Sequence, residues 1–401
     1  MNLVIWAILG FLAIAGNARI GLFSLNRLVF AEKHESDRLK YGLVAIPVIL
    51  LLLAPLYWFF IHGFRSGRMT PLAIGGAIWL ALTVATGIYW LIDRSWYNFH
   101  PPKVDGVITH PPERIRMRKP HVESRPLRAL GAHNDVYDLE ITSHDVVISD
   151  LPESFVGYRI AFMTDTHVTG FMRRDFYRRC VDEIREREVD LVLLGGDFVT
   201  WQKDIELMAE VLLDGLTAKD GVWAVLGNHD YWADADSVVA AMTARGVRFL
   251  VNRSTRLRRG HDVIDLVGID ELYRGTPDLE ATFRSVPGNR PCIGVSHHPD
   301  ITGLIEDQRI DLLVAGHTHG GQIRLPFLGA IVVPSKHEAL YASGFHRDQN
   351  VLLYVSRGLG AVPPIRILCP PELALFRLVR ERRSEEGAVS EDLPLRPDRR
   401  D

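Results

Sequence analysis

Residues 190–197 read Asp-Leu-Val-Leu-Leu-Gly-Gly-Asp, an apolar run that ends in two glycines and a carboxylate. A short apolar run of this kind is typical of a strand that is buried on both faces of a parallel sheet. Comparable runs recur along the chain and predict seven strands, at 159–164, 190–195, 221–227, 263–268, 292–296, 311–316 and 351–356.

Helical patterns follow several of these strands, at 173–188, 204–216, 237–244 and 301–308. Strands that alternate with helices predict a layered α/β domain, which we place at residues 134–381. Domains of this class bind their ligands at the carboxyl ends of the strands. The residues that follow each strand are therefore the first place to look for a functional site.

Five strand ends carry side chains of the kind that bind metal ions. They are Asp165-Thr166-His167, Gly196-Asp197, Gly227-Asn228-His229-Asp230, Ser296-His297-His298-Pro299 and Gly316-His317-Thr318-His319. A single Asp or His at such a position is more often a loop cap, but five in one domain favour a metal centre. Oxygen and nitrogen donors without a thiolate suit Mn, Fe, Zn or Co rather than a structural zinc knuckle.

These donors suffice for two divalent ions if one carboxylate bridges them. Four positive charges, set against Asp165, Asp197 and a bridging hydroxide, leave about one positive charge for an anionic substrate. Two ions about 4 Å apart activate a shared water and stabilise both the attacking and the leaving oxygen of an in-line displacement. The strand ends therefore predict metal-assisted hydrolysis of a phosphoester.

Taken in order, the five motifs resemble those of the calcineurin-like metallophosphoesterases over roughly residues 134–379. The stretches 316–322, 356–360 and 369–372 resemble the bacterial membrane-associated branch of that family. That branch includes lipid-linked phosphodiesterases and a UDP-2,3-diacylglucosamine hydrolase of lipid A synthesis. The resemblance implies two β-sheets flanked by helices, a four-layer α/β/β/α sandwich.

The resemblance also implies roles for individual residues. It places Asp165, His167, Asp197 and His319 around one metal ion, and Asp197, Asn228, His297 and His317 around the other. Asp197 then bridges the two ions. In the Ser-His-x-Pro motif the ligand is the first histidine, which makes His298 a neighbour of the site. His229 would face the scissile phosphate, as a general acid or as a stabiliser of developing charge.

One motif departs from the pattern of the protein phosphatases in this family. They continue Gly-Asp as Gly-Asp-x-x-Asp-Arg-Gly, whereas Asp197 is followed here by Phe-Val-Thr-Trp. Thr200 supplies no anionic partner for the histidine, which favours a diester or pyrophosphate over a phosphoprotein. Asp230 is expected instead to support either His229 or one of the metal ligands. Arg324 and Arg357 are candidate phosphate contacts, with ion pairs or carbonyl contacts as their alternative role.

Residues 1–92 contain three apolar runs, at 2–18, 41–61 and 71–92. The last two carry no charge over about 20 residues, the length of a bilayer crossing. They predict three transmembrane helices, the first uncleaved and extended through 20–30. A buried helical hairpin is the alternative for the second and third. Lys and Arg are denser at 19–40 and after residue 92 than at 62–70, which predicts that both basic segments are cytoplasmic.

Two further segments and the overall composition complete the prediction. Residues 93–133, rich in proline and basic side chains, predict a linker with little packing that is either solvated or held against anionic headgroups. Residues 382–401 predict a disordered tail. Three widely spaced cysteines and a net charge of −3 argue against a disulfide framework and against nucleic acid as a partner.

We therefore expect a multi-pass enzyme of the plasma (inner) membrane whose cytoplasmic domain holds two divalent ions, with Mn favoured over Fe, Zn or Co. A hydroxide shared by the ions would attack a phosphodiester or pyrophosphate bond in a lipid-linked substrate, because tethering concentrates the domain near lipid headgroups. Membrane lipids and that substrate are the expected partners. The alternatives are a hydrolase of a soluble nucleotide or phosphomonoester that uses the anchor only for location, and a non-catalytic membrane scaffold that retains the fold.

Overall fold

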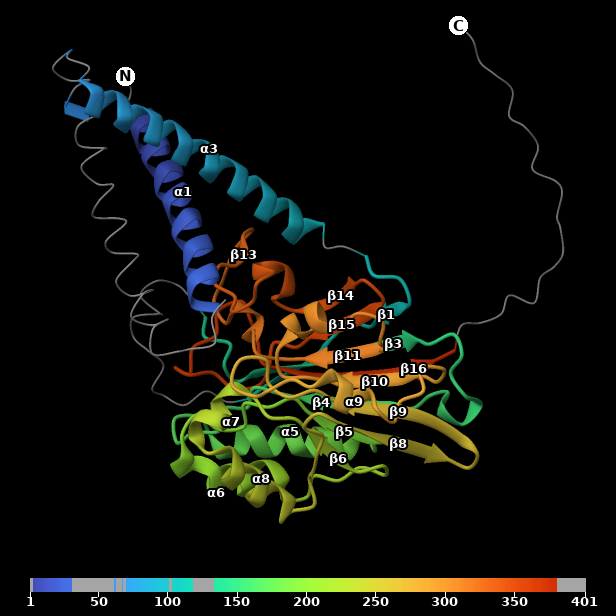
Figure 1. Cartoon of the computed structure of the whole chain (residues 1–401). Helices are drawn as coiled ribbons and strands as arrows, with labels where there is room; N and C mark the ends of the chain where they lie inside the picture. The colour runs from blue at the N-terminus through green and yellow to red at the C-terminus, as the bar shows by residue number, and fades with distance from the viewer. Residues whose placement is uncertain are drawn as a thin grey trace, which may run out of the picture.

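The structure of the protein is a computed structural model that describes residues 3–30, 61–62, 67, 70–100, 103–117 and 133–380. A domain of two β-sheets carries helices on its outer faces, and two long helices lie to one side of it (Figure 1). Residues 41–60 of the apolar run expected to span the membrane at 41–61, and the tail expected at 382–401, lie outside the described residues.

The first sheet has the strand order β1-β3-β16-β4-β5-β6-β7, and β2 also pairs with β3. Its strands are β1 (Val107–Thr109), β2 (Glu113–Arg116), β3 (Asp138–Val147), β4 (Arg159–Met163), β5 (Leu191–Leu194), β6 (Val222–Ala224), β7 (Arg248–Phe249) and β16 (Glu372–Val379). Strands β4 to β7 run parallel. Their carboxyl ends therefore meet at one edge of the sheet.

The second sheet has the strand order β14-β15-β11-β10-β9-β8. Its strands are β8 (Arg253–Arg259), β9 (Asp262–Gly268), β10 (Cys292–Val295), β11 (Leu312–Ala315), β14 (Gly344–Asp348) and β15 (Val351–Val355). Strands β9, β10, β11 and β15 are parallel, so their carboxyl ends also gather at one edge. A separate hairpin is formed by β12 (Arg324–Leu325) and β13 (Gly329–Ala330).

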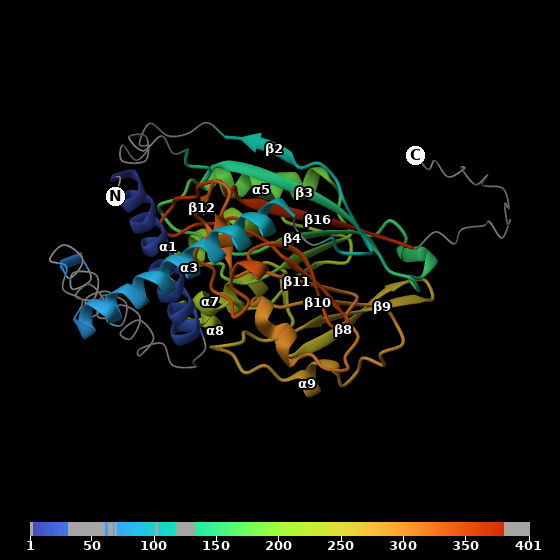
Figure 2. The same cartoon turned by 90° about the horizontal axis from the view of Figure 1, so that it is seen from above.

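The two sheets pack face to face on apolar side chains such as Phe162 and Leu193 of the first sheet and Ile293 and Val314 of the second. The outer face of the first sheet packs on α5 (Arg174–Glu186), α6 (Ile205–Met208) and α8 (Ala235–Thr243). The second sheet packs on α9 (Leu279–Phe283) and on the 3₁₀ helix Pro299–Leu304. Figure 2 shows α5 and α9 on opposite sides of the strands. The layers follow the expected α/β/β/α order.

Each of the seven expected strands is present, but two expected helices differ. The helix expected at 204–216 is α6 followed by a π-helical turn, Ala209–Leu213. The prediction of a helix at 301–308 is wrong, because this segment forms only the 3₁₀ helix Pro299–Leu304 and the backbone is extended at Ile305. Ile301, Leu304 and Ile305 have helical spacing, but Gly303 among them has a low helix propensity.

Residues 93–117 do not form the expected linker with little packing. Helix α3 (Pro71–Phe99) continues beyond the apolar run, and β1 and β2 pair with β3. Val107 and Ile115 pack against the cores on either side of the first sheet. Charged residues and proline are tolerated on edge strands and between them, which explains why the composition resembles that of a linker.

Two long helices, α1 (Leu3–Phe30) and α3, pack against each other beside the domain. Their backbones approach closely, since a Cβ atom at Gly87 would lie 2.2 Å from the carbonyl oxygen of Leu12. On α3, Ile78 and Leu82 are 57% and 55% exposed. Among the described residues, one helix, Ala73–Phe99, is long and apolar enough to cross a membrane.

Replacing Gly87 by valine is expected to destabilise the α1–α3 pair by about 2 kcal/mol, the usual cost of overpacking a close contact. The readout is the melting midpoint of the full chain in detergent. Gly75→Val is the matched control, because Gly75 lies in the same helix and a Cβ there would meet nothing within 4 Å. Equal shifts for the two variants would refute the close crossing.

Candidate metal centre

The five expected motifs meet where the parallel strands of both sheets end. The first sheet contributes Asp165 and His167 after β4 and Asp197 after β5. The segment after β6 leads into the short helix α7 (Asn228–Ala233), whose first residue is Asn228. The second sheet contributes the histidines that follow β10 and β11. Residues that are far apart in the sequence are thus brought to one place by the topology.

The first group of metal-type ligands consists of Asp165, His167, Asp197 and His319. Each offers a ligand atom, and these atoms lie within 4.8 Å of one another. His167 Nε2 is 3.4 Å from Asp197 Oδ2, and His319 Nε2 is 3.4 Å from Asp165 Oδ1. The Nε2 atoms of His167 and His319 face each other at 3.1 Å.

The second group consists of Asp197, His297 and His317, again within 4.8 Å. His297 Nε2 lies 3.4 Å from Asp197 Oδ2, 3.1 Å from His317 Nδ1 and 3.2 Å from Asn228 Oδ1. Asp197 belongs to both groups, so its carboxylate is placed to be shared. The structure therefore brings together all seven side chains that the resemblance nominated as ligands.

His298 lies beside the second group rather than in it. Its Nδ1 accepts a hydrogen bond from the backbone N–H of Asp300 at 3.1 Å. Its ring packs on that of His317, with centroids 4.1 Å apart. The first histidine of the adjacent pair is therefore the one that faces Asp197.

The donor set fits divalent cations. Burial lowers the pKa of His167 to about 3 and that of His319 well below its usual value, so both rings are neutral and hold lone pairs. Two such nitrogens at 3.1 Å favour a cation between them and the carboxylates. Burial opposes ionisation of Asp197, but His297 and His229 outweigh it and hold its pKa well below the usual range.

Backbone strain is concentrated at the ligands. The φ angles are 51° at Asp165, 40° at His167, 53° at Asp197, 68° at His317 and 51° at His319. Positive φ costs a non-glycine residue on the order of 1 kcal/mol, and such residues cluster at functional sites. The surrounding fold maintains this strain through close contacts; a Cβ atom at Gly316 would lie 2.2 Å from Asp165 Oδ2.

Hydrogen bonds that the sequence did not reveal orient the ligand rings. His297 Nδ1 lies 2.8 Å from the carbonyl oxygen of Gly195, which directs its Nε2 towards Asp197. Thr200 Oγ1 lies 3.1 Å from His167 Nδ1. Contacts of this kind fix the tautomer and the angle of a ligating imidazole. Thr200, at the position of the phosphatase aspartate, thus supports a ligand.

Asp230 holds the loop that carries Asp197. Its carboxylate accepts backbone N–H groups of Asp197 and Phe198 at 2.8 Å and of Gly227 at 2.9 Å. The backbone N–H of His229 donates to Asp197 Oδ1 at 2.8 Å. The His229 ring is edge-on to His167, with centroids 4.7 Å apart. Asp230 therefore supports Asp197, and His229 lies beside the first group.

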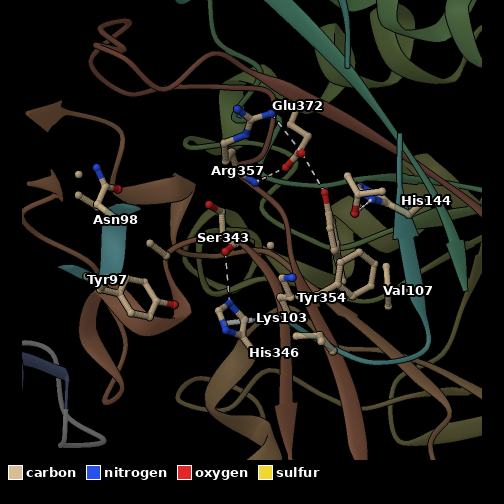
Figure 3. A pocket seen from close by; sticks show the side chains of 18 of the residues that line it. Tyr97, Asn98, Lys103, Val107, His144, Ser343, His346, Tyr354, Arg357 and Glu372 are labelled. Carbon is tan, nitrogen blue, oxygen red and sulfur yellow. Dashed lines mark hydrogen bonds and ion pairs between the residues drawn. The ribbon is translucent and has the colours of Figure 1, made fainter. Parts of the chain in front are cut away.

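The structure does not bring Arg324 and Arg357 to the seven ligands. Both line a cavity of about 730 Å³ that none of the ligands lines. The Arg357 guanidinium lies 2.7 Å from Glu140 and 3.2 Å from Glu372, and Figure 3 shows the second of these pairs. Arg324 donates to the Gly320 carbonyl oxygen and to Ser343 Oγ, both at 2.7 Å. Both arginines therefore make the ion pairs and carbonyl contacts that were the alternative to phosphate binding.

Removing Arg357 is expected to destabilise the fold, because buried Glu140 and Glu372 would lose their shared partner. The expected loss is about 3 kcal/mol at pH 7. Burial raises the pKa of Glu372, but Arg357 outweighs it and lowers the pKa from 4.5 to about 2. A depressed carboxyl pKa stabilises the fold above pH 4.5, and this contribution is lost as the pH falls towards 2.

Denaturant unfolding of Arg357→Ala and of the unmodified chain at several pH values tests this prediction. The difference in unfolding free energy should shrink as the pH falls from 5 to 2, about the range over which Glu372 gains its proton. Arg253→Ala, a change at an exposed arginine, is the control and should be neutral. A difference that does not depend on pH would contradict the role of the ion pair.

Comparison with known proteins agrees with this geometry. The profile of the calcineurin-like phosphoesterases matches residues 158–321, which include all seven ligands and His229. The uncharacterized metallophosphoesterase YkuE of Bacillus subtilis is 32% identical over 248 residues, 60% of this chain and 85% of that protein. This chain belongs to the calcineurin-like phosphoesterase family. It is accordingly a metal-dependent phosphoester hydrolase, and the two groups that share Asp197 are the candidates for the dinuclear metal centre of this family.

Two further relatives within the calcineurin-like phosphoesterases have more specific names. Phosphodiesterase YaeI of Escherichia coli is 28% identical, over 55% of this chain and 82% of that protein. UDP-2,3-diacylglucosamine pyrophosphatase LpxG of Chlamydia trachomatis is 26% identical, over 58% of this chain and 88% of that protein. The predicted resemblance to the lipid-linked branch is confirmed.

Proposed function

We propose that this protein is a membrane-anchored hydrolase of a phosphodiester or pyrophosphate bond in a lipid-linked substrate. The observation that carries the proposal is the pair of ligand groups joined at Asp197. Their seven side chains would hold two divalent ions, with Mn proposed ahead of Fe, Zn or Co. When bound, such ions polarise phosphoryl oxygens and lower the pKa of water.

The residues around the ligands have distinct proposed roles. His229, beside the first group, would give a proton to the leaving oxygen or stabilise its charge. Asp230 and Thr200 would position Asp197 and His167 through the hydrogen bonds described above. No arginine lies in the Gly-Asp motif to meet the second negative charge of a monoester, which favours a diester or pyrophosphate.

The helices α1 and α3 support anchoring in the inner membrane. Close packing through a small residue such as Gly87 is typical of helix pairs in membranes. The exposed apolar side chains of α3 would be covered by lipid acyl chains. The density of Lys and Arg on either side of the apolar runs supports a multi-pass arrangement with the catalytic domain in the cytoplasm.

Exposed aromatic side chains near the candidate metal ligands favour a substrate that has an apolar portion. Trp232 contacts His229, with ring centroids 4.3 Å apart, and is 43% exposed. Phe171, 65% exposed, contacts Trp201 with centroids 5.9 Å apart. Such rings bind acyl chains, and they also stack on the base of a soluble nucleotide, which keeps the soluble substrate as the alternative. The assembled ligand set speaks against a non-catalytic scaffold.

Hydrolysis by the full chain in detergent with Mn²⁺ tests the proposal. Bis(p-nitrophenyl) phosphate should be cleaved faster than p-nitrophenyl phosphate, and a chelator should abolish both activities. UDP-2,3-diacylglucosamine should then be a better substrate than UDP-N-acetylglucosamine. Faster cleavage of the monoester, or activity that survives the chelator, would contradict the reaction. Preference for the soluble sugar nucleotide would contradict the lipid-linked substrate alone.

A further inference from the structure

A cavity of about 730 Å³ lies between the end of α3 and the second sheet (Figure 3). Helix α3 contributes Arg94, Tyr97 and Asn98 to it, and the opposite wall includes Arg324 and Ser343. None of the seven metal ligands lines this cavity. It is therefore a separate feature from the metal centre, and the chemistry proposed there does not account for it.

The cavity lies at the level where α3 would leave the membrane. The apolar run of α3 gives way to Arg94, Trp96 and Tyr97, the residue types that favour the boundary between headgroups and acyl chains. Tyr97 donates to the carbonyl oxygen of Leu340 at 3.4 Å, and Asn98 donates to that of Phe327 at 3.3 Å. These contacts place the hairpin β12–β13 and its neighbours at the same level as the end of α3.

The lining carries an excess of positive charge. Arg94, Lys103 and Arg324 contribute cations, whereas Asp105 is the one lining carboxylate besides Glu372, which pairs with Arg357. Within the described residues, Lys103 makes no ion pair or side-chain hydrogen bond. In the part of the chain that the structure describes, the hydrogen bonds donated by the Arg94 and Arg324 guanidinium groups go to neutral oxygen atoms, of Ala330, Gly320 and Ser343.

His144 supplies a second observation that points to a ligand. It lines the cavity, is 5% exposed and has its Nδ1 3.0 Å from Thr109 Oγ1 (Figure 3). Its Nε2 is buried and has no hydrogen-bond partner among the residues that the structure describes. A buried polar atom without a partner costs on the order of 1–3 kcal/mol, which an oxygen atom of a ligand would offset.

We propose that this cavity binds a phosphate-bearing anionic group, supplied either by the headgroup of a membrane phospholipid or by soluble phosphate. The cations of the lining, Lys103, Arg94 and Arg324, would attract its negative charge, and the His144 imidazole would contact one of the ligand's oxygen atoms. Because one wall belongs to α3 and the other to the catalytic domain, the bound group would hold the domain in a fixed orientation at the membrane surface. This inference goes beyond the proposed hydrolysis and does not depend on it.

Calorimetric titration of the full-length protein, with its metals, into dihexanoyl phosphatidylglycerol tests the proposal. Inorganic phosphate is titrated in parallel, and dihexanoyl glycerol, which lacks the phosphate, is the control ligand. Saturable binding of the phospholipid without comparable binding of phosphate identifies a headgroup as the source. Equal affinity for the phospholipid and for inorganic phosphate identifies soluble phosphate as the source of the bound group. Absence of saturable binding by either, or equal binding of dihexanoyl glycerol, overturns the proposal.

Variants assign the binding to the cavity. Lys103→Gln and His144→Phe should each weaken it about tenfold, since a charge-assisted hydrogen bond contributes on that order. Lys336→Gln removes an exposed charge outside the cavity lining, and it should leave the affinity unchanged. Equal weakening by Lys336→Gln would overturn the proposal in favour of general surface attraction.

Binding must also be separated from the metal centre, because phosphate is a ligand of dinuclear sites. The titrations are therefore repeated with Asp197→Asn, which alters the metal centre and leaves the cavity lining intact. Affinity retained in this variant supports the cavity as the binding site. Affinity lost in Asp197→Asn but retained in Lys103→Gln and His144→Phe would overturn the proposal, whatever the activity of the enzyme.

Discussion

Replacing Asp197 by alanine is expected to reduce diester hydrolysis by at least about 10³-fold, because metal-assisted displacement contributes several kcal/mol to the lowering of the barrier. Asp197 is the one side chain common to both ligand groups, and its Oδ2 lies 3.4 Å from His167 Nε2 and from His297 Nε2. Its loss should therefore weaken both metal positions. Initial rates with bis(p-nitrophenyl) phosphate, together with the metal content of each variant, measure the effect.

The control for this variant is Asp307→Ala, which removes an exposed carboxylate outside the site. It should retain full activity and both metals. The altered Asp197 protein should keep its secondary structure, because backbone N–H groups of the loop still donate hydrogen bonds to the Asp230 carboxylate. Activity of the Asp197 variant within tenfold of the unmodified protein would contradict a shared ligand at this position.

Replacing His229 by alanine is expected to lower kcat by about 10²- to 10⁴-fold, the usual contribution of a positioned acid or base. Unlike the loss of Asp197, this change should leave the metal content intact, since the His229 ring belongs to neither ligand group. Its ring lies beside that of His167, where a leaving oxygen could be reached. Measuring kcat and bound metal on the same preparation distinguishes the two variants.

The leaving group gives this prediction a sharper test. A proton donor matters less when the leaving oxygen is weakly basic, so the loss should be smaller for a p-nitrophenyl diester than for an alkyl diester. His261→Ala, at an exposed histidine distant in sequence from the motifs, is the control and should have no effect. Loss of metal on replacing His229, or an equal loss of rate for all leaving groups, would contradict a role as proton donor.

The sequence predicted the catalytic domain well because its strands are parallel and short. Parallel strands end at a common edge, so residues that follow different strands, such as Asp165, Asp197 and His317, converge without any knowledge of the loops. The loops themselves are strained, with positive φ at each of these three residues. The residue types still indicated the chemistry, because Asp and His are the donors that divalent ions require.

Other features could not be predicted because they depend on tertiary contacts. The role of Thr200 depends on where His167 points, and a hydroxyl in the sequence does not reveal this. The positive charge of Arg357 was expected to bind phosphate, but Glu140 and Glu372 already surround it. Strands β1 and β2 resemble a linker because edge strands accept proline and charge.

The count of tightly bound metal ions in the full-length protein tests the central claim most directly. Elemental analysis after exchange into metal-free buffer should find two divalent ions per chain, and Asp197→Ala should hold fewer. Manganese should restore diester hydrolysis to the stripped protein in proportion to the ions that it rebinds. A single tightly bound ion that sustains full activity, or none at all, would contradict the dinuclear centre built around Asp197.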